Sequence, residues 1–111
     1  MPDLLEEGIL YFNSGRFYEA HEVWEDLWRL THGPLRTCYQ GLIQAAVGLH
    51  HLGRQNQTGG KSQLQKAIRN LQADASRARE VDIPGLIAQL QNILAHLPDG
   101  PSAAPRIARL K

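Results

Sequence analysis

Apolar residues recur every three or four positions along almost the whole of this chain, and no segment shows the sustained alternation typical of a β-strand. The first such stripe ends at "NSG", where Gly15 can take the left-handed backbone conformation that closes a helix. With 111 residues and short connections, the pattern predicts a single all-α domain of about five helices in a compact antiparallel bundle. The first stripe consists of Leu4, Leu5, Gly8, Ile9 and Phe12.

Turn residues divide the pattern into helices over about residues 4–12, 16–32, 34–53, 61–79 and 82–97. Asp82 is the expected N-cap of the last helix, with Pro84 in its first turn. The stretch "RQNQTGG" is a loop by composition. We expect one helical domain over residues 1–97 and a flexible tail over residues 98–111, which are rich in Pro, Ala and Ser. The alternative for the tail is a short basic helix that docks on the acidic N-terminal third.

The charge of the chain is nearly balanced in total but divided along the sequence. Residues 1–30 carry a net charge of −5 and the remainder carries +6, for a formal total of +1. The total gives no indication of nucleic acid or a membrane surface as a partner. Two solvated faces of opposite charge would explain this division as well as an attraction within the fold or between subunits. We expect a homodimer, joined through apolar surface that the last helix leaves uncovered.

Cys38 is the only cysteine, which excludes an internal disulfide and favours a reducing compartment. The N-terminus carries acids where a signal peptide needs positive charge. No apolar run reaches the roughly 18 residues that a membrane span needs. These features predict a cytoplasmic protein that does not bind a membrane.

The second helix carries the residues that bear on chemistry. Its apolar face includes Trp24 and Trp28, and His21 and Glu25 stand one turn apart at the edge of that face. A histidine held by a carboxylate has a defined tautomer, as a general base or a metal ligand requires. The third helix carries one polar stripe on an otherwise apolar surface, and buried amides and imidazoles need hydrogen-bond partners. That stripe consists of Thr37, Gln40, Gln44 and His51.

We expect these two sets of polar residues to meet in a groove between the second and third helices. His50 points about 100° away from His51, so we expect it in the core instead. Trp24 and Trp28 form the apolar wall of the expected groove. The expected polar site consists of His21, Glu22, Glu25, Gln40, Gln44 and His51.

Several roles are open for such a site. One is a non-catalytic module that binds a peptide, a protein or a small molecule, and another is a purely structural polar network. A third is a metal-dependent hydrolase using His21, Glu25 and His51, a set suited to zinc, iron or manganese. The chain lacks the Glu-x-x-His repeat of two-metal bundles and the second histidine of a zinc-protease helix. Neither Cys38 nor Ser14 has a positioned base. We favour the binding module and expect no cofactor.

The segments "FNSGRFYEAHEVWEDLWRL" and "QGLIQAAVGLHHLGRQN" together resemble a small prokaryotic all-helical family described only as a domain of unknown function. Its paired signature is Asn-x-Gly-x-aromatic-x-Glu-Ala-His-Glu-x-Trp-Glu and Gly-Leu-Ile-Gln, followed by a His and a Gly-Asn turn. The resemblance covers about residues 8–71 and implies an α-helical fold with no established reaction. Gln55 departs from the family, which usually has Gly there. The matching residues are Asn13, Gly15, Phe17, Glu19, Ala20, His21, Glu22, Trp24, Glu25, Trp28, Gly41, Leu42, Ile43, Gln44, His51 and Asn56.

A second resemblance is to the helical hairpin of tetratricopeptide repeats, in which small and aromatic residues pack two antiparallel helices together. Gly8, Tyr11, Ala20 and Trp24 stand at such positions. No repeat of about 34 residues follows clearly, and solenoids of this kind need several repeats for stability. A tetratricopeptide-like hairpin that binds a peptide therefore stays open as a further role.

Overall fold

The computed structural model describes residues 3–73, 81–97 and 105–108. Its helices are α1 (Leu4–Asn13), α2 (Phe17–Leu30), α3 (Leu35–Gly53), α4 (Gln57–Ala73) and α5 (Ile83–Ala95). Each helix packs against the next one along the chain. The predicted all-α antiparallel bundle is confirmed, and the only extended pairing in the described residues is an isolated bridge at Val81. Within the same ranges, none of the helices combines the length and the apolar character that a bilayer span requires.

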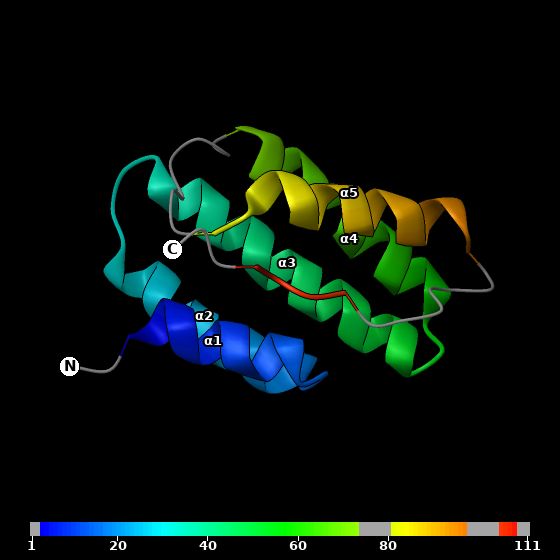
Figure 1. Cartoon of the computed structure of the whole chain (residues 1–111), viewed down its shortest axis with the longest axis horizontal. Coiled ribbons are helices and arrows are strands. Elements are labelled where there is room, and N and C mark those ends of the chain that lie inside the picture. Colours follow the sequence, from blue (N-terminus) through cyan, green and yellow to red (C-terminus); the bar gives the residue numbers. More distant parts are fainter. Residues whose placement is uncertain (1–2, 74–80, 98–104, 109–111) are drawn as a thin grey trace.

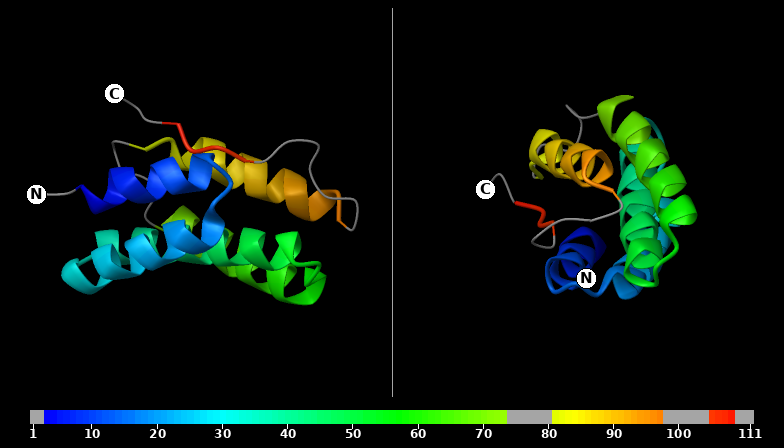
Figure 2. Two further views of the ribbon diagram at one scale, coloured as in Figure 1. Left: turned by 90° about the horizontal axis from the view of Figure 1, so that it is seen from below. Right: turned by 90° about the vertical axis from the view of Figure 1, so that its right-hand side faces the viewer.

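The helices form two layers (Figures 1 and 2). One layer consists of α2, α3 and α4 side by side, with α3 in the middle and in contact with both neighbours. The other layer contains α1 and α5, which stand apart from each other (Figure 2). The extended residues 105–108 run between α1 and α5 and complete that second layer.

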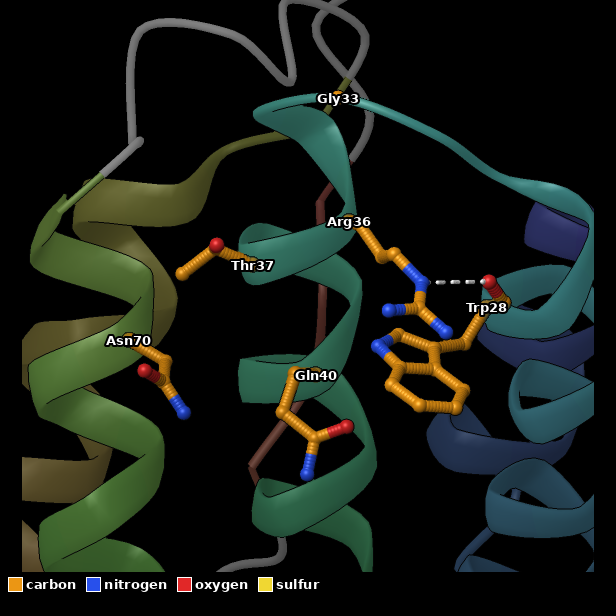
Figure 3. A pocket seen from close by; sticks show the side chains of 6 residues that line it. All are labelled: Trp28, Gly33, Arg36, Thr37, Gln40 and Asn70. Carbon is orange, nitrogen blue, oxygen red and sulfur yellow. Dashed lines mark hydrogen bonds between the residues drawn. The ribbon is translucent and has the colours of Figure 1, made fainter.

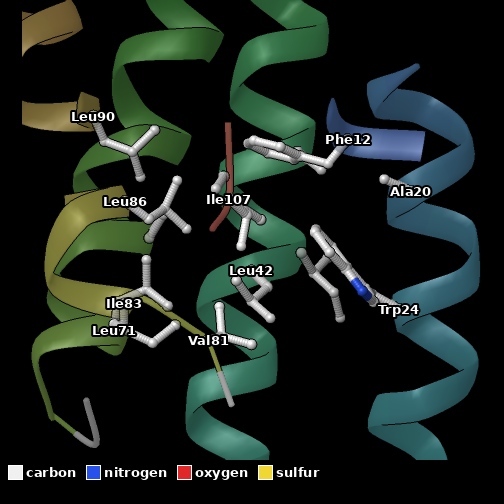
Figure 4. Close-up of a cluster of buried hydrophobic side chains, with 14 of the residues drawn as sticks. Phe12, Ala20, Trp24, Leu42, Leu71, Val81, Ile83, Leu86, Leu90 and Ile107 are labelled. Atoms are coloured by element: carbon white, nitrogen blue, oxygen red, sulfur yellow. The ribbon is translucent and has the colours of Figure 1, made fainter. Parts of the chain in front are cut away.

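The hydrophobic core lies between the two layers (Figure 4). Helices α1, α4 and α5 all supply buried residues to it. The third helix contributes most of all, as expected of a helix that is apolar on most sides. Trp24 is among the largest fully buried side chains. Others are Phe12, Leu42, Leu64, Leu71, Val81, Ile83, Leu86 and Leu90.

Two helix ends follow the predicted chemistry. Asp82 caps α5, because its side chain accepts a hydrogen bond from the backbone N–H of Gly85 at 3.0 Å. Gly15 closes α1 with a φ of 78°, and the next residue, Arg16, donates its N–H back to Tyr11 O at 2.9 Å. These ends set the directions in which α2 and α5 leave their turns.

The start of α4 corrects the prediction that "RQNQTGG" is a loop throughout. The helix begins at Gln57 rather than at Lys61, because Asn56 caps it: Gly59 N donates to Asn56 Oδ1 at 3.0 Å. Gly60 then packs directly against α3, where an added Cβ would meet Leu52. The glycines that resemble a loop in the sequence therefore allow close helix packing. The predicted end of this helix at residue 79 lies outside the described residues.

Part of the predicted C-terminal tail packs on the fold. Pro105 and Ile107 are buried, and residues 105–108 are extended rather than helical. For these four residues, neither a free tail nor a docked basic helix describes what the structure shows. Residues 98–104 and 109–111 lie outside the described ranges.

Candidate functional site

The pairing of His21 with Glu25 on α2 forms as the helical spacing predicts. His21 Nε2 lies 3.3 Å from a carboxylate oxygen of Glu25. The other ring nitrogen, Nδ1, lies 3.3 Å from the backbone oxygen of Tyr18. Both ring nitrogens therefore face an oxygen acceptor on α2 itself, and neither points towards α3.

The expected meeting of this pair with the polar stripe of α3 does not occur. Gln44 Oε1 instead accepts a hydrogen bond from Asn70 Nδ2 on α4, at 2.7 Å. His51 Nδ1 lies 3.4 Å from Asn56 Nδ2, in the turn that follows α3. Because Asn70 of α4 reaches the stripe, Gln44 finds its partner there rather than on α2.

His50, and not His51, is the histidine of α3 that faces α2. The ring of Tyr18 lies 5.2 Å from the ring of His50 and 5.3 Å from the ring of His21. The expectation of His50 in the core is therefore wrong, because α2 packs one helical step away from the polar stripe. Across the described ranges, no three His, Cys, Asp or Glu side chains lie close enough to hold a metal, so His21, Glu25 and His51 do not form the set that the metal-dependent hydrolase alternative requires.

The two tryptophans have different positions. Trp24 is fully buried, and its Nε1 donates to Leu5 O of α1 at 3.3 Å, so it does not line a groove. Trp28 is half-buried at the surface between α2 and α3, where it can serve as the expected wall. Glu22 is exposed on α2. The expected site therefore reduces to Trp28 and the polar residues on the nearby turns of α3.

A groove of about 480 Å³ crosses the outer face of the layer formed by α2, α3 and α4 (Figure 3). Of the expected polar-site and wall residues, Trp28 and Gln40 line it. The Arg36 groove, as we call it, is lined by Trp28, Gly33, Arg36, Thr37, Gln40 and Asn70.

Like Asn70, Arg36 is a groove residue that the sequence did not reveal. Its guanidinium carbon lies 3.6 Å from the centroid of the Trp28 ring, and its Nε donates to Trp28 O at 3.4 Å (Figure 3). Its terminal nitrogens have no hydrogen bond or ion pair to any described residue. One signal was available: the "HGP" turn between the two helices brings the end of α2 against the start of α3.

Thr37 and Gln40 stand next to Arg36 along the groove. Both side chains are partly exposed, and neither has a hydrogen-bond partner in the part of the chain that the structure describes. The Arg36 groove therefore presents one oriented cation, one aromatic face, a hydroxyl and an amide. This set of groups can bind a polar ligand, and it includes no nucleophile with a base beside it.

A second hollow, of about 390 Å³, lies near the C-terminal end of α3. Arg16 there forms an ion pair with Glu19 at 3.0 Å. A hydrogen bond from its own backbone N–H and another from Arg16 hold the pKa of Glu19 below its usual value. Because Arg16 is already paired, this hollow offers less unsatisfied charge than the Arg36 groove. Its lining consists of Gly15, Arg16, Phe17, Tyr18, Glu19, Leu49, His50, Gly53 and Arg54.

Many of the signature positions have structural roles. Gly41 packs so closely on α4 that an added Cβ would meet Leu71. His51 and Asn56 bind each other in the turn after α3, and Gly15 adopts a left-handed conformation. These positions specify the fold more than they specify a reaction.

Comparison with other proteins places the chain in a family. Residues 5–63 match the family model described as "Domain of unknown function (DUF309)". An uncharacterized protein of Aquifex aeolicus (strain VF5) is 31% identical over 93 residues, which cover 83% of this chain and 28% of that protein. The uncharacterized protein YpuF of Bacillus subtilis (strain 168) is 41% identical over 75 residues, covering 66% of this chain and 43% of YpuF. The chain spans less than half the length of either relative. It belongs to the DUF309 family of domains of unknown function.

Proposed function

We propose that this chain is a non-catalytic binding module, that the Arg36 groove is its site, and that its ligand is a peptide segment carrying a carboxylate. One observation carries the proposal. The guanidinium of Arg36 is stacked 3.6 Å from the Trp28 ring centroid, while its terminal nitrogens are unpaired among the described residues. The described residues thus hold a cation in place at the surface and supply no hydrogen-bond or ion-pair partner for its terminal nitrogens.

A guanidinium held in this way suits a carboxylate. Its planar fork offers two parallel N–H donors, which match the two oxygens of one carboxylate. The stack on Trp28 and the Nε hydrogen bond also restrict the side chain before binding, which reduces the rotamer entropy lost when a ligand arrives. Because the groove is open to solvent, this charge pair alone supplies only a modest affinity.

The neighbours of Arg36 favour a peptide over a simple anion. Gln40 offers both a donor and an acceptor, as the backbone of a peptide does, and Thr37 adds a hydroxyl. Trp28 gives an apolar surface against which a side chain can pack. A ligand that has a carboxylate, backbone amides and some apolar surface would use every group in the groove.

The alternatives have less support. A metal-dependent hydrolase would need three converging ligands, which are not gathered in the described ranges, and a histidine nitrogen free of other contacts. Cys38 is fully buried, so it is not accessible as a nucleophile. The tetratricopeptide-like alternative is supported by the α1–α2 pair alone, and a single hairpin has no concave surface of stacked repeats.

A homodimer in the cytoplasm remains a prediction. The buried apolar residues of α5 face the core, and the large exposed apolar residues in the described ranges lie on α1 and α2. We therefore move the proposed dimer contact from α5 to the α1–α2 hairpin, where Leu10 is 63% and Tyr18 is 50% exposed.

The test of the proposed ligand is an NMR titration of the intact chain with acetyl-Ala-Glu-Ala-amide and with its neutral counterpart, acetyl-Ala-Gln-Ala-amide. We expect saturable shifts of the Trp28 indole N–H and the Arg36 Nε–H with the glutamate peptide. The expected Kd is on the order of 1 mM, because one charge pair and a few contacts supply about 4 kcal/mol. The glutamine peptide should bind several-fold more weakly.

Arg36→Lys provides the matched variant, because it keeps the charge but loses the planar fork and the stack. We expect it to weaken binding of the glutamate peptide several-fold. Arg69→Lys, at an exposed position of α4 outside the groove lining, should leave the affinity unchanged. Equal affinity for the two peptides, or an affinity that Arg36→Lys does not alter, would contradict the proposal.

A further inference from the structure

Residues 105–108 are held as an extended strand between α1 and α5, largely by two side-chain amides. Asn13 of α1 donates from Nδ2 to Ile107 O at 3.0 Å and accepts from Ile107 N at 2.7 Å. Gln89 of α5 donates from Nε2 to Arg106 O at 2.8 Å and accepts from Arg106 N at 2.9 Å. The backbone of residues 106 and 107 is thus bound by α1 on one side and by α5 on the other. We call the space between Asn13 and Gln89 that this strand fills the cleft.

A further backbone bond extends the same pattern. Asp82 N, at the start of α5, donates to Ala108 O at 2.8 Å. In the described residues, none of the hydrogen bonds that hold this strand uses one of its side chains. Hydrogen bonding to the strand therefore uses only backbone groups, which any extended peptide carries.

The side chains of the strand alternate between core and solvent. Pro105 and Ile107 are buried, while Arg106 and Ala108 are exposed. Ile107 is only 3% exposed and enters the core beside Phe12 and Leu86 (Figure 4). The cleft therefore selects two apolar side chains, two residues apart, and leaves the residue between them free to vary.

We propose that the cleft between α1 and α5 is a peptide-binding site, in which residues 105–108 are the occupant that the chain itself supplies. The site accepts an extended peptide in trans with an apolar residue, any residue and then a branched aliphatic residue. Main-chain hydrogen bonds combined with pockets for alternate side chains are a general way of binding extended peptides. This cleft lies in the layer that does not contain the Arg36 groove, so each site can fail its test independently of the other.

The strand attached to the chain competes with any peptide added from outside. A tethered segment acts at an effective concentration of the order of millimolar. The experiment therefore uses the full chain with Ile107→Asp, which removes the apolar anchor and keeps Asn13 and Gln89. The probe is a fluorescein-labelled synthetic peptide with the sequence of residues 103–110, followed by fluorescence polarisation.

We expect saturable binding of this peptide to the Ile107→Asp chain, and binding at least about tenfold weaker to the wild-type chain, whose own strand fills the cleft. Adding Asn13→Ala to the Ile107→Asp chain removes two hydrogen bonds and should weaken binding about tenfold. A control peptide with Asp in place of Ile should not bind. Equal binding of the two peptides, or no binding to a folded Ile107→Asp chain, overturns the proposal.

A second measurement needs no substitution, and it applies even if Ile107→Asp prevents folding. In the wild-type chain, the amides of Ile107 and Arg106 are bonded to Asn13 and Gln89. A displaceable strand opens separately from the bundle, so these amides should exchange with solvent faster than the amide of Ala45 in α3, after correction for intrinsic rates. Exchange of Ile107 at the same rate as Ala45, through unfolding of the whole chain, overturns the proposal.

Discussion

Gly8 of α1 lies directly against the indole of Trp24 on α2, so that a Cβ at position 8 would overlap the indole nitrogen. This approach allows Trp24 Nε1 to donate to Leu5 O at 3.3 Å. The contact brings α1 close to α2 and uses the one polar atom of the Trp24 side chain. It also explains why Trp24 is a core residue while Trp28, one turn later, is left at the surface.

We predict that Gly8→Ala lowers the free energy of unfolding by about 1–3 kcal/mol, because the added methyl group overpacks the contact with Trp24. The change acts against helix propensity, which alone favours Ala over Gly by about 1 kcal/mol. Gly53→Ala is the matched control, since a Cβ there would meet no atom within 4 Å. It should raise stability by up to about 1 kcal/mol. Denaturant unfolding followed by circular dichroism measures both, and equal effects of the two substitutions would refute the packing argument.

The helices could be predicted because an apolar stripe can be buried in only one way, with that face of the helix turned towards the core. The polar residues were harder, because a helical wheel gives the side of a helix on which a residue lies and not the helix that covers that side. Gln44 and His21 were expected to meet, yet Asn70 of α4 lies against Gln44. His50 rather than His51 faces Tyr18 of α2, because the helix that covers α3 there lies one helical step from the expected side.

Two features had almost no signal in the sequence. Arg36 joins Trp28 only because of the angle at the turn between α2 and α3. Ile107 is one aliphatic residue in a stretch rich in Pro, Ala and Ser, which is the composition of a loop. Its partner Asn13 is 94 residues away, so no local pattern connects them.

Gln55 offers a test of backbone strain. It has a φ of 63°, and the next residue, Asn56, donates its N–H back to His51 O at 2.8 Å, the same pattern with which Gly15 closes α1. A left-handed conformation costs a residue with a Cβ about 1–2 kcal/mol. We therefore predict that Gln55→Gly raises the free energy of unfolding by about 1 kcal/mol.

Arg54→Gly is the control for that prediction, because Arg54 has a φ of −102° and no such strain to relieve. It should lower stability by up to about 1 kcal/mol, since glycine gains more freedom in the unfolded chain. Thermal unfolding of the wild type, Gln55→Gly and Arg54→Gly under the same conditions ranks their stabilities. A Gln55→Gly chain that unfolds at a lower temperature than the wild type would show that the turn is not strained.

Glu19 gives a prediction about pH. Its pKa lies below the ordinary value of 4.5, because its own backbone N–H and Arg16 stabilise the carboxylate. A depressed pKa in the folded state adds stability that is present above pH 4.5 and is lost as the pH falls through the folded pKa. Glu19→Gln should therefore lose less stability on acidification below pH 4.5 than the wild type. Glu22→Gln removes an exposed carboxylate of the same helix and is the control, and an identical pH profile for Glu19→Gln and the wild type would contradict the account.

The homodimer can be tested by light scattering. We predict a mass of two chains at protein concentrations well above micromolar, and a mass of one chain for Leu10→Asp, which places a charge on the exposed part of the α1–α2 hairpin. Leu30→Asp, at a residue that is 72% exposed at the far end of α2, should leave the dimer intact. A mass of one chain for the wild type at every concentration would rule the dimer out.

The most direct test of the proposed function is to locate the bound peptide by NMR. With acetyl-Ala-Glu-Ala-amide in excess, intermolecular NOEs should connect the glutamate methylene protons with the indole ring of Trp28. Shifts should gather at residues 28, 36, 37 and 40, which line the Arg36 groove. Intermolecular NOEs to Tyr18, with shifts gathered around the second hollow at residues 15–19 and 49–54, would contradict the account.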